Sequence, residues 1–201
     1  MNAQRLSCLL TLACLAMPAP AQNAVTVYAG ARSGSGFKQA ASPNDAIDMN
    51  SSAAGSLAIE WPYDASRQLQ LFASHQRTRL DLGATASPRE LPLNVTYLHI
   101  GGLNYFEGTV GTGPYVAGGL GVTVFDPRLA GTSSRVRGSL NVGLGYQWSI
   151  TRALALRTEL RGYATFVRSS GSFFCSGGCT VSIKGDALTQ VEAMAGLTFG
   201  F

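Results

Sequence analysis

The sequence is poor in charged side chains. Only 13% of its 201 residues are charged, and lysine and histidine occur twice each, whereas about a quarter of the residues are charged in typical soluble domains. The formal net charge is +4, but the arginines are scattered and form no basic run of the kind that binds nucleic acid. No run of about 20 apolar residues is present, which excludes a membrane-spanning helix. With 46% apolar residues, the chain is nevertheless not a disordered one.

The N-terminal segment has the pattern of a secretory signal peptide. A basic residue precedes the apolar segment 6–17, and Ala19-Pro20-Ala21 forms an A-x-A cleavage site. We therefore expect a cleaved signal peptide over residues 1–21 and one mature domain over residues 22–201. Two alternatives are a buried N-terminal helix and a lipoprotein cleaved before Cys14, although the residues before this cysteine fit a lipobox poorly.

Two cysteines remain in the mature chain, Cys175 and Cys179. Because an exported chain meets an oxidising compartment, we expect a disulfide that closes a small loop and stiffens it. Metal binding is the alternative, but neither a histidine nor a third cysteine lies near this pair in the sequence.

The mature chain alternates between apolar and polar residues with a period of two. Residues 135–149, 154–166 and 190–201 show the pattern clearly, and weaker examples occupy residues 24–33, 53–61, 68–78, 93–106 and 114–125. Such a strand has one apolar and one polar face. The clear segments exceed the five or six residues of an average strand and suit a tilted membrane strand of about 9 to 11.

One of these segments is ambiguous, because both parities of residues 93–106 carry apolar side chains. We interpret Leu98, Ile100 and Phe106 as the outward-facing set.

Short and long connections take turns between these segments, as they do in outer-membrane barrels. We therefore predict an all-β fold, an eight-stranded antiparallel up-and-down transmembrane β-barrel. An even number of strands places both termini on the periplasmic side, together with the short turns, and places the long loops outside.

Alternation does not by itself show which face meets lipid, since a soluble lipocalin-like barrel would turn its apolar face inward. The scarcity of lysine, the glycine and alanine of the polar face, and aromatic residues at the strand ends favour lipid on the apolar side. The expected interfacial aromatics are Trp61, Tyr146 and Trp148, with Phe199 and Phe201 at the C-terminus.

The lumen of eight strands is just wide enough to be filled by side chains. We expect arginine–carboxylate networks there, because unpaired buried charges are costly. The charges assigned to the lumen are Glu60, Arg137, Arg157, Glu159, Arg161 and Glu192. The expected role is structural or a surface interaction with an unidentified ligand, without a cofactor or metal; the alternative is a narrow porin-like channel for small solutes.

An enzyme is not expected. Ser74 and His75 are adjacent, so they point to opposite faces of a strand and do not form a nucleophile–base pair. His99 lies within a strand and has no serine beside it in the sequence.

The C-terminal strand, which ends in Phe199 and Phe201, resembles the signal by which outer-membrane proteins are recognised for assembly. This resemblance implies the outer-membrane assembly machinery as a partner and a Gram-negative cell envelope.

Three segments, Tyr97–Gly102, Pro114–Gly121 and Arg161–Thr165, resemble a group of proteobacterial outer membrane β-barrel proteins of the OmpA-like transmembrane or porin-like superfamily. The resemblance implies the barrel fold and the bacterial outer membrane as location. We further expect a monomer whose contacts are outer-membrane lipids and lipopolysaccharide. Members also carry a cysteine pair before the last strand, like Cys175 and Cys179. No activity is implied.

Overall fold

The computed structural model describes residues 23–34, 37–38, 46–81, 90–107, 109–128, 131–166, 172–173, 181–182 and 187–201. The expected signal peptide and the cysteines Cys175 and Cys179 lie outside these described residues.

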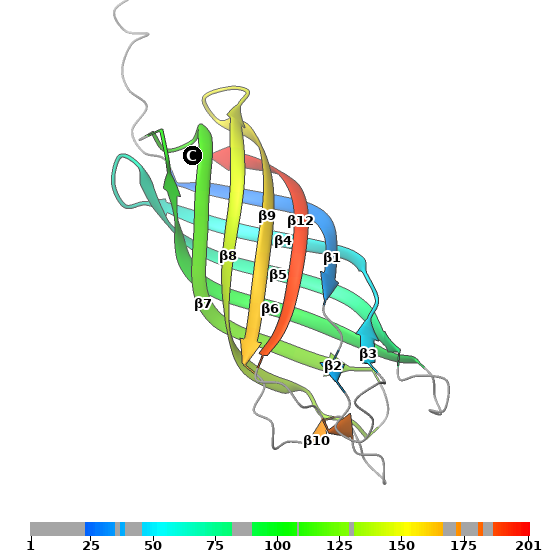
Figure 1. Ribbon diagram of the computed structural model, residues 1–201. Coiled ribbons are helices and arrows are strands. Elements are labelled where there is room, and N and C mark those ends of the chain that lie inside the picture. The colour runs from blue at the N-terminus through cyan, green and yellow to red at the C-terminus, as the bar shows by residue number, and fades with distance from the viewer. Residues whose placement is uncertain are drawn as a thin grey trace, which may run out of the picture.

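Eight long strands form a closed barrel (Figure 1). They are β1 (Ala24–Gly34), β4 (Ser52–Pro62), β5 (Arg67–Asp81), β6 (Glu90–Tyr105), β7 (Gly113–Pro127), β8 (Arg135–Ser149), β9 (Leu154–Phe166) and β12 (Ala187–Gly200). Each pairs antiparallel with the next long strand along the chain, and β12 pairs with β1. The predicted eight-stranded up-and-down barrel is therefore confirmed.

The described residues also include four short strands. The strands β2 (Phe37–Lys38) and β3 (Ala46–Met49) pair with each other, and β3 also pairs with β5. The strands β10 (Ser172–Phe173) and β11 (Val181–Ser182) form a separate two-stranded sheet. Among the described residues, no helix has the length and apolar character needed to cross a membrane.

The apolar side chains of the middle of the barrel face outward. Leu120 is 66% exposed and Ile100 is 71% exposed, whereas Glu60 and Arg157 are fully buried. A sheet with alternating faces produces this arrangement when hydrocarbon, and not water, contacts the outer side. Leu98 is also exposed on this face, and Phe106 is exposed just beyond β6, so the interpretation of the ambiguous segment is confirmed.

We call the end of the barrel that carries the short turns, Asn23 and the C-terminal residue Phe201 the turn end, and the opposite end the loop end. At the turn end, Ala24 is the register partner of Gly200, and the amide of Phe201 donates to the carbonyl of Asn23 at 2.9 Å. The aromatic side chains of Trp61, Tyr146, Trp148 and Phe199 are exposed here on the outer wall. The two rings of Tyr146 and Trp148 lie against each other, with centroids 4.5 Å apart.

The strands β5 and β6 extend further toward the loop end than the sequence pattern indicated, pairing as far as Asp81 and Glu90. The alternation continues there with its faces reversed: Leu80 and Leu91 are buried inside, and Arg79 is exposed outside. A prediction that follows the apolar outer face along the sequence therefore ends these strands too early, at the residues where the two faces reverse. The reversal indicates that the strands leave the lipid layer at this level.

The turn between β4 and β5 is held by one carboxylate. Oδ1 of Asp64 accepts the backbone N–H groups of Ser66 at 2.9 Å and Arg67 at 2.8 Å, and Oδ2 accepts Nε of Arg67 at 2.7 Å. The hydrogen bond from the Arg67 side chain, followed by that from the Ser66 backbone, lowers the pKa of Asp64 to about 2. The carboxylate therefore stays ionised through the mildly acidic range.

Replacing Leu120 by arginine tests whether lipid contacts the outer wall. Leu120 lies at the middle of β7, and an arginine at the bilayer midplane costs about 2–4 kcal/mol. Val136→Arg, at the loop end of β8, is the matched control. It lies near the membrane interface, so the expected loss of unfolding free energy is about 0–1 kcal/mol. The measurement is urea-induced unfolding from phospholipid vesicles. Negligible costs for both variants would mean that water wets this wall.

The Asp64 turn predicts a specific pH dependence. Since folding lowers the pKa of Asp64, its contribution to turn stability is fully present above the ordinary value of about 3.9 and is lost as the pH falls through about 2. Carboxyl-carbon NMR is expected to show this low titration, and Arg67→Gln is expected to raise the pKa. An ordinary wild-type pKa would contradict the proposed role of the hydrogen bonds.

Candidate functional site: the charged interior

Three arginine–glutamate pairs occupy the interior of the barrel. Nη2 of Arg32 lies 2.9 Å from Oε2 of Glu192, and the other pairs are Arg157 with Glu60 and Arg161 with Glu159. All six residues are at least 96% buried. Their charges cancel, which is required because an uncompensated charge in a water-poor interior is strongly unfavourable.

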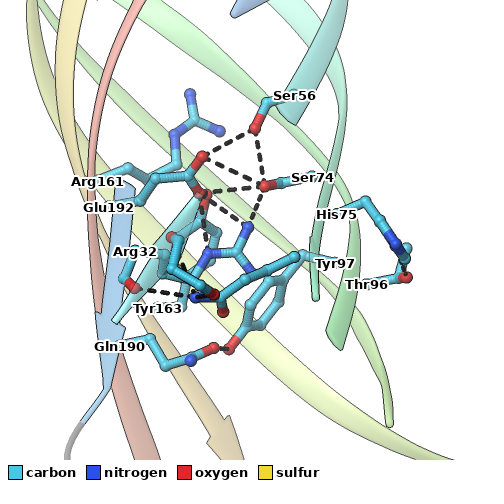
Figure 2. Close-up of polar contacts among 12 residues, drawn as sticks. Arg32, Ser56, Ser74, His75, Thr96, Tyr97, Arg161, Tyr163, Gln190 and Glu192 are labelled. Atoms are coloured by element: carbon cyan, nitrogen blue, oxygen red, sulfur yellow. Dashed lines mark hydrogen bonds and ion pairs between the residues drawn. The ribbon is translucent and has the colours of Figure 1, made fainter. Parts of the chain in front are cut away.

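Glu192 lies between two arginines in the sheet register, with Arg32 on β1 and Arg161 on β9 as its partners across the strands. Its Oε2 accepts hydrogen bonds from Nε of Arg32 at 3.1 Å and from the Tyr163 hydroxyl at 2.6 Å, and its Oε1 accepts from Ser56 at 2.9 Å. Figure 2 shows these groups converging on the carboxylate. Both carboxylate oxygens are thus satisfied without water.

The guanidinium of Arg32 also lies against two tyrosine rings. Its Cζ is 4.9 Å from the ring centroid of Tyr97 and 5.1 Å from that of Tyr163, and the two rings stack at 4.2 Å. The Tyr97 hydroxyl donates to Oε1 of Gln190 at 2.7 Å. Cation–π contacts of this kind add attraction where water is excluded, so the rings fix the arginine in one position.

Arg157 is the centre of a second cluster, nearer the turn end. In addition to its pair with Glu60, its Nε donates to Oε1 of Gln147 at 2.9 Å. Its two Nη atoms donate to the hydroxyls of Tyr28 at 3.1 Å and Tyr105 at 3.0 Å. Arginine presents five N–H donors in a planar fork, and this cluster supplies acceptors on every side of it.

Two inward-facing glycines make room for the third pair. A Cβ atom on Gly145 would lie 2.3 Å from the Tyr115 ring, and one on Gly143 would lie 2.7 Å from Glu159. In the space so provided, the Tyr115 hydroxyl donates to Oε2 of Glu159 at 2.7 Å. Arg161, the partner of Glu159, lies over the ring of Phe72 at 3.8 Å. Small residues on the polar parity of β8 are therefore part of the packing of the charges.

Above the charges, toward the loop end, the interior becomes apolar. Leu80, Leu91, Leu93 and Leu188 are buried together with Met49 at the loop-end portions of their strands. We call these five residues the apolar plug. The plug places buried apolar side chains between the charged clusters and the loop end of the barrel.

At the turn end, by contrast, a vestibule of about 500 Å³ enters the barrel. Turn residues of the β8–β9 connection form its rim, and Gln68, Gln147 and Arg157 line its inner part. The vestibule ends at Arg157, whose side chain fills the barrel in front of the other two pairs.

The structure places five of the six charges assigned to the lumen, Glu60, Arg157, Glu159, Arg161 and Glu192, in these three pairs. Arg137 is half-buried near the loop-end start of β8 and belongs to none of them. Arg32 was not expected. The inward parity of β1, which Arg32 shares with Tyr28, was a usable signal, because Val27, next to Tyr28 and of the opposite parity, faces outward.

Ser74 and His75 point to opposite faces of the wall, as their adjacency in the sequence predicts. Ser74 points inward and its Oγ donates to Glu192 at 3.1 Å, whereas His75 points outward and its Nδ1 lies 2.9 Å from Thr96 Oγ1 (Figure 2).

His99 has no serine beside it in the sequence, but the fold brings one close from another strand. Its Nε2 lies 2.9 Å from Oγ of Ser139 on β8. Both side chains are buried, and Nδ1 of His99 has no hydrogen-bond partner among the described residues. A histidine that activates a serine needs a group to orient it and access for a substrate, and this pair has neither in the described part of the chain. Nor does that part contain a group of three residues able to hold a metal ion.

No family model matches the chain, and no curated protein matches it. Solved structures do. Neisserial surface protein A is 12% identical, with 89% of this chain and 97% of that chain covered and a TM-score of 0.62. The outer membrane protein AlkL is 12% identical, with 92% and 93% covered and a TM-score of 0.55. The N-terminal β-barrel domain of Pseudomonas aeruginosa OprF is 16% identical, with 90% and 99% covered and a TM-score of 0.51.

At these identities the likeness shows the fold alone. The chain has the fold of small eight-stranded outer-membrane β-barrels, as the sequence resemblance implied, and this fold supports the expected outer-membrane location.

Removing the carboxylate of Glu192 is expected to destabilise the barrel strongly. Glu192→Gln leaves Arg32 buried without its counter-charge, at a cost of about 3–5 kcal/mol in unfolding free energy. The double variant Arg32→Gln/Glu192→Gln is expected to cost less than the single one, because it leaves no charge unbalanced. Glu90→Gln, which breaks the exposed pair with Arg79, is the control at about 0–1 kcal/mol. Equal costs for Glu192→Gln and Glu90→Gln would show that the buried pair matters no more than an exposed one.

Proposed function

We propose that this chain is a bacterial outer-membrane β-barrel with a closed interior, whose role is structural or lies in contacts at the cell surface. The observation that carries the proposal is the filling of the lumen. Arg32, Arg157, Arg161, Tyr97, Tyr105 and Tyr115 are the largest fully buried side chains among the described residues. Because water does not reach these side chains, no continuous column of water passes through the barrel at their level.

The energetics of the interior favour a rigid filling over a gate. To open a path, a paired arginine would have to leave its carboxylate and its ring contacts, and an unpaired buried charge costs several kcal/mol. The apolar plug would have to move as well. The barrel then serves as a stiff support for the loops at its loop end, where binding residues collect on such scaffolds.

In this proposal the turn end faces the periplasm and the loop end faces outside. The signal peptide over residues 1–21 is removed on export, and a disulfide joins Cys175 and Cys179 in the last long loop. The barrel is a monomer surrounded by outer-membrane lipids and lipopolysaccharide. The aromatics of the turn end lie at the inner interface, a position that suits their amphipathic rings, and Phe199 and Phe201 present the assembly signal.

A narrow channel for small solutes is the second candidate, and the vestibule at the turn end favours it. The vestibule brings solvent as far as Gln147 and Arg157, so a solute would have to pass only the paired arginines and the apolar plug. These layers lie in series between the vestibule and the loop end, and they support the closed barrel as the better proposal.

Conductance across a planar lipid bilayer separates the two candidates. We expect the refolded wild-type protein to insert and to show no steady conductance. Insertion is checked by heat-modifiable mobility on gels and by protection from protease. A steady wild-type conductance that Arg157→Gln alters in size or ion selectivity would contradict the closed interior and establish the channel.

The location is tested separately by cell fractionation. The protein is expected in the outer-membrane fraction, with mobility that changes on heating. Recovery of folded protein from the soluble periplasm would contradict the proposed orientation of the two faces.

A further inference from the structure

The outer wall changes from apolar to polar along β5 and β6. Leu71 and Leu98 are exposed on the apolar part of this wall. The next level toward the loop end carries His75 and Thr96, which bind each other through their side chains. Beyond it lie Arg77 opposite Asn94, and then Arg79 opposite Pro92. The arginines therefore begin directly where the apolar surface ends.

A groove of about 520 Å³ opens at this level of the wall. Three arginines line it, Arg77 and Arg79 from β5 and Arg128 from the end of β7. Between them lie small polar residues, which are Asn50, Ser51, Ser52, Thr78 and Asn94. All three arginines are exposed. The groove thus offers three guanidinium groups together with the exposed side chains of Asn50 and Ser51.

The height of the groove matches the outer surface of a bilayer. Leu69 on β5 is paired with Trp61, a member of the aromatic group at the turn end. Strands rise about 3.3 Å per residue and tilt by about 35–45° in such barrels. Arg77 and Arg79 follow Leu69 along the same strand, so they lie roughly 20–25 Å further along the barrel axis, close to the height of about 25 Å of an apolar band.

The charge of the groove is positive. Arg79 pairs with Glu90 at 3.3 Å, and Oδ2 of Asp126 accepts a hydrogen bond from Nδ2 of Asn94 at 3.4 Å. Arg77 and Arg128 form no ion pair with a described residue. Among the described residues, the lining of the groove contains three arginines and no carboxylate, and the guanidinium groups of Arg77 and Arg128 retain their donors for a ligand.

We propose that this groove binds the phosphate groups of a phosphorylated glycolipid of the outer leaflet, that is, of lipopolysaccharide. Guanidinium groups bind phosphate oxygens through paired charge-assisted hydrogen bonds, and the asparagine and serine side chains of the groove suit the hydroxyl groups of the attached sugars. The acyl chains of such a lipid lie along the apolar wall below. The inference rests on the proposed outer-membrane location, because only there does this lipid surround the barrel.

The test measures the binding of purified lipid A to the refolded full-length chain in detergent. Thermophoresis or native mass spectrometry reports the affinity. Bisphosphorylated lipid A is compared with the same lipid after removal of both phosphates. We expect the wild-type protein to bind the phosphorylated form at least fivefold more tightly. Arg128→Gln is expected to weaken this preference and Arg77→Gln/Arg128→Gln to remove it, whereas Glu90→Gln, which releases Arg79, is expected to increase it.

Arg152→Gln is the matched control, since Arg152 is an exposed arginine in the β8–β9 turn at the opposite end of the barrel. It removes one positive charge, as Arg128→Gln does, and is expected to leave binding unchanged. Heat-modifiable mobility confirms that each variant is folded.

Three results would overturn the proposal. The first is equal binding of the two lipid forms, and the second is an equal loss of lipid A binding in Arg152→Gln and Arg128→Gln. The third is displacement of bound lipid A by a sulfated polysaccharide, which would identify a polysaccharide as the ligand of the groove. Cell fractionation and conductance are independent of these measurements, so failure of the groove and failure of the proposed function are distinguishable.

Discussion

Mutual neutralisation of six buried charges is the constraint on which the rest of the barrel depends. A wall with an apolar outer face must turn its polar face inward, and eight strands enclose too little space to hydrate that face generously. The arginines and glutamates therefore have to satisfy each other, with tyrosine hydroxyls completing their hydrogen bonds. The glycines of β8 and the stacked rings follow from this requirement, since both create the space or the surface that a guanidinium needs.

Much of the fold could be predicted from the sequence, because period-2 alternation is a local property. The parity of residues 135–149 alone fixes which side chains share a face, and the alternation of short and long connections fixes the up-and-down order. The same parity placed Glu192 and Arg161 inside without any knowledge of the sheet. Where the polarity of the two faces reverses, at Arg79 and Leu80, the same local rule ended the strand too early.

The partners inside the lumen could not be predicted in this way. Arg32 and Glu192 are far apart in the sequence and meet only because β12 closes against β1 in one register. The contact between His99 and Ser139 arises likewise, across the intervening strand β7. Such contacts depend on the stagger of the whole closed sheet and on the depth to which each side chain reaches. A single sequence shows the faces of the strands but not these distances.

The seam between β1 and β12 has a consequence for how the protein is made. These strands are the first and the last long strands of the barrel, and their pairing from Ala24 to Gly34 completes the cylinder. Until the last strand arrives, two sheet edges with free backbone donors and acceptors remain open to any neighbouring chain. The nascent polypeptide therefore stays vulnerable to edge-to-edge aggregation until its final segment docks, and a chaperone that shields those edges in transit meets a need that the topology itself creates.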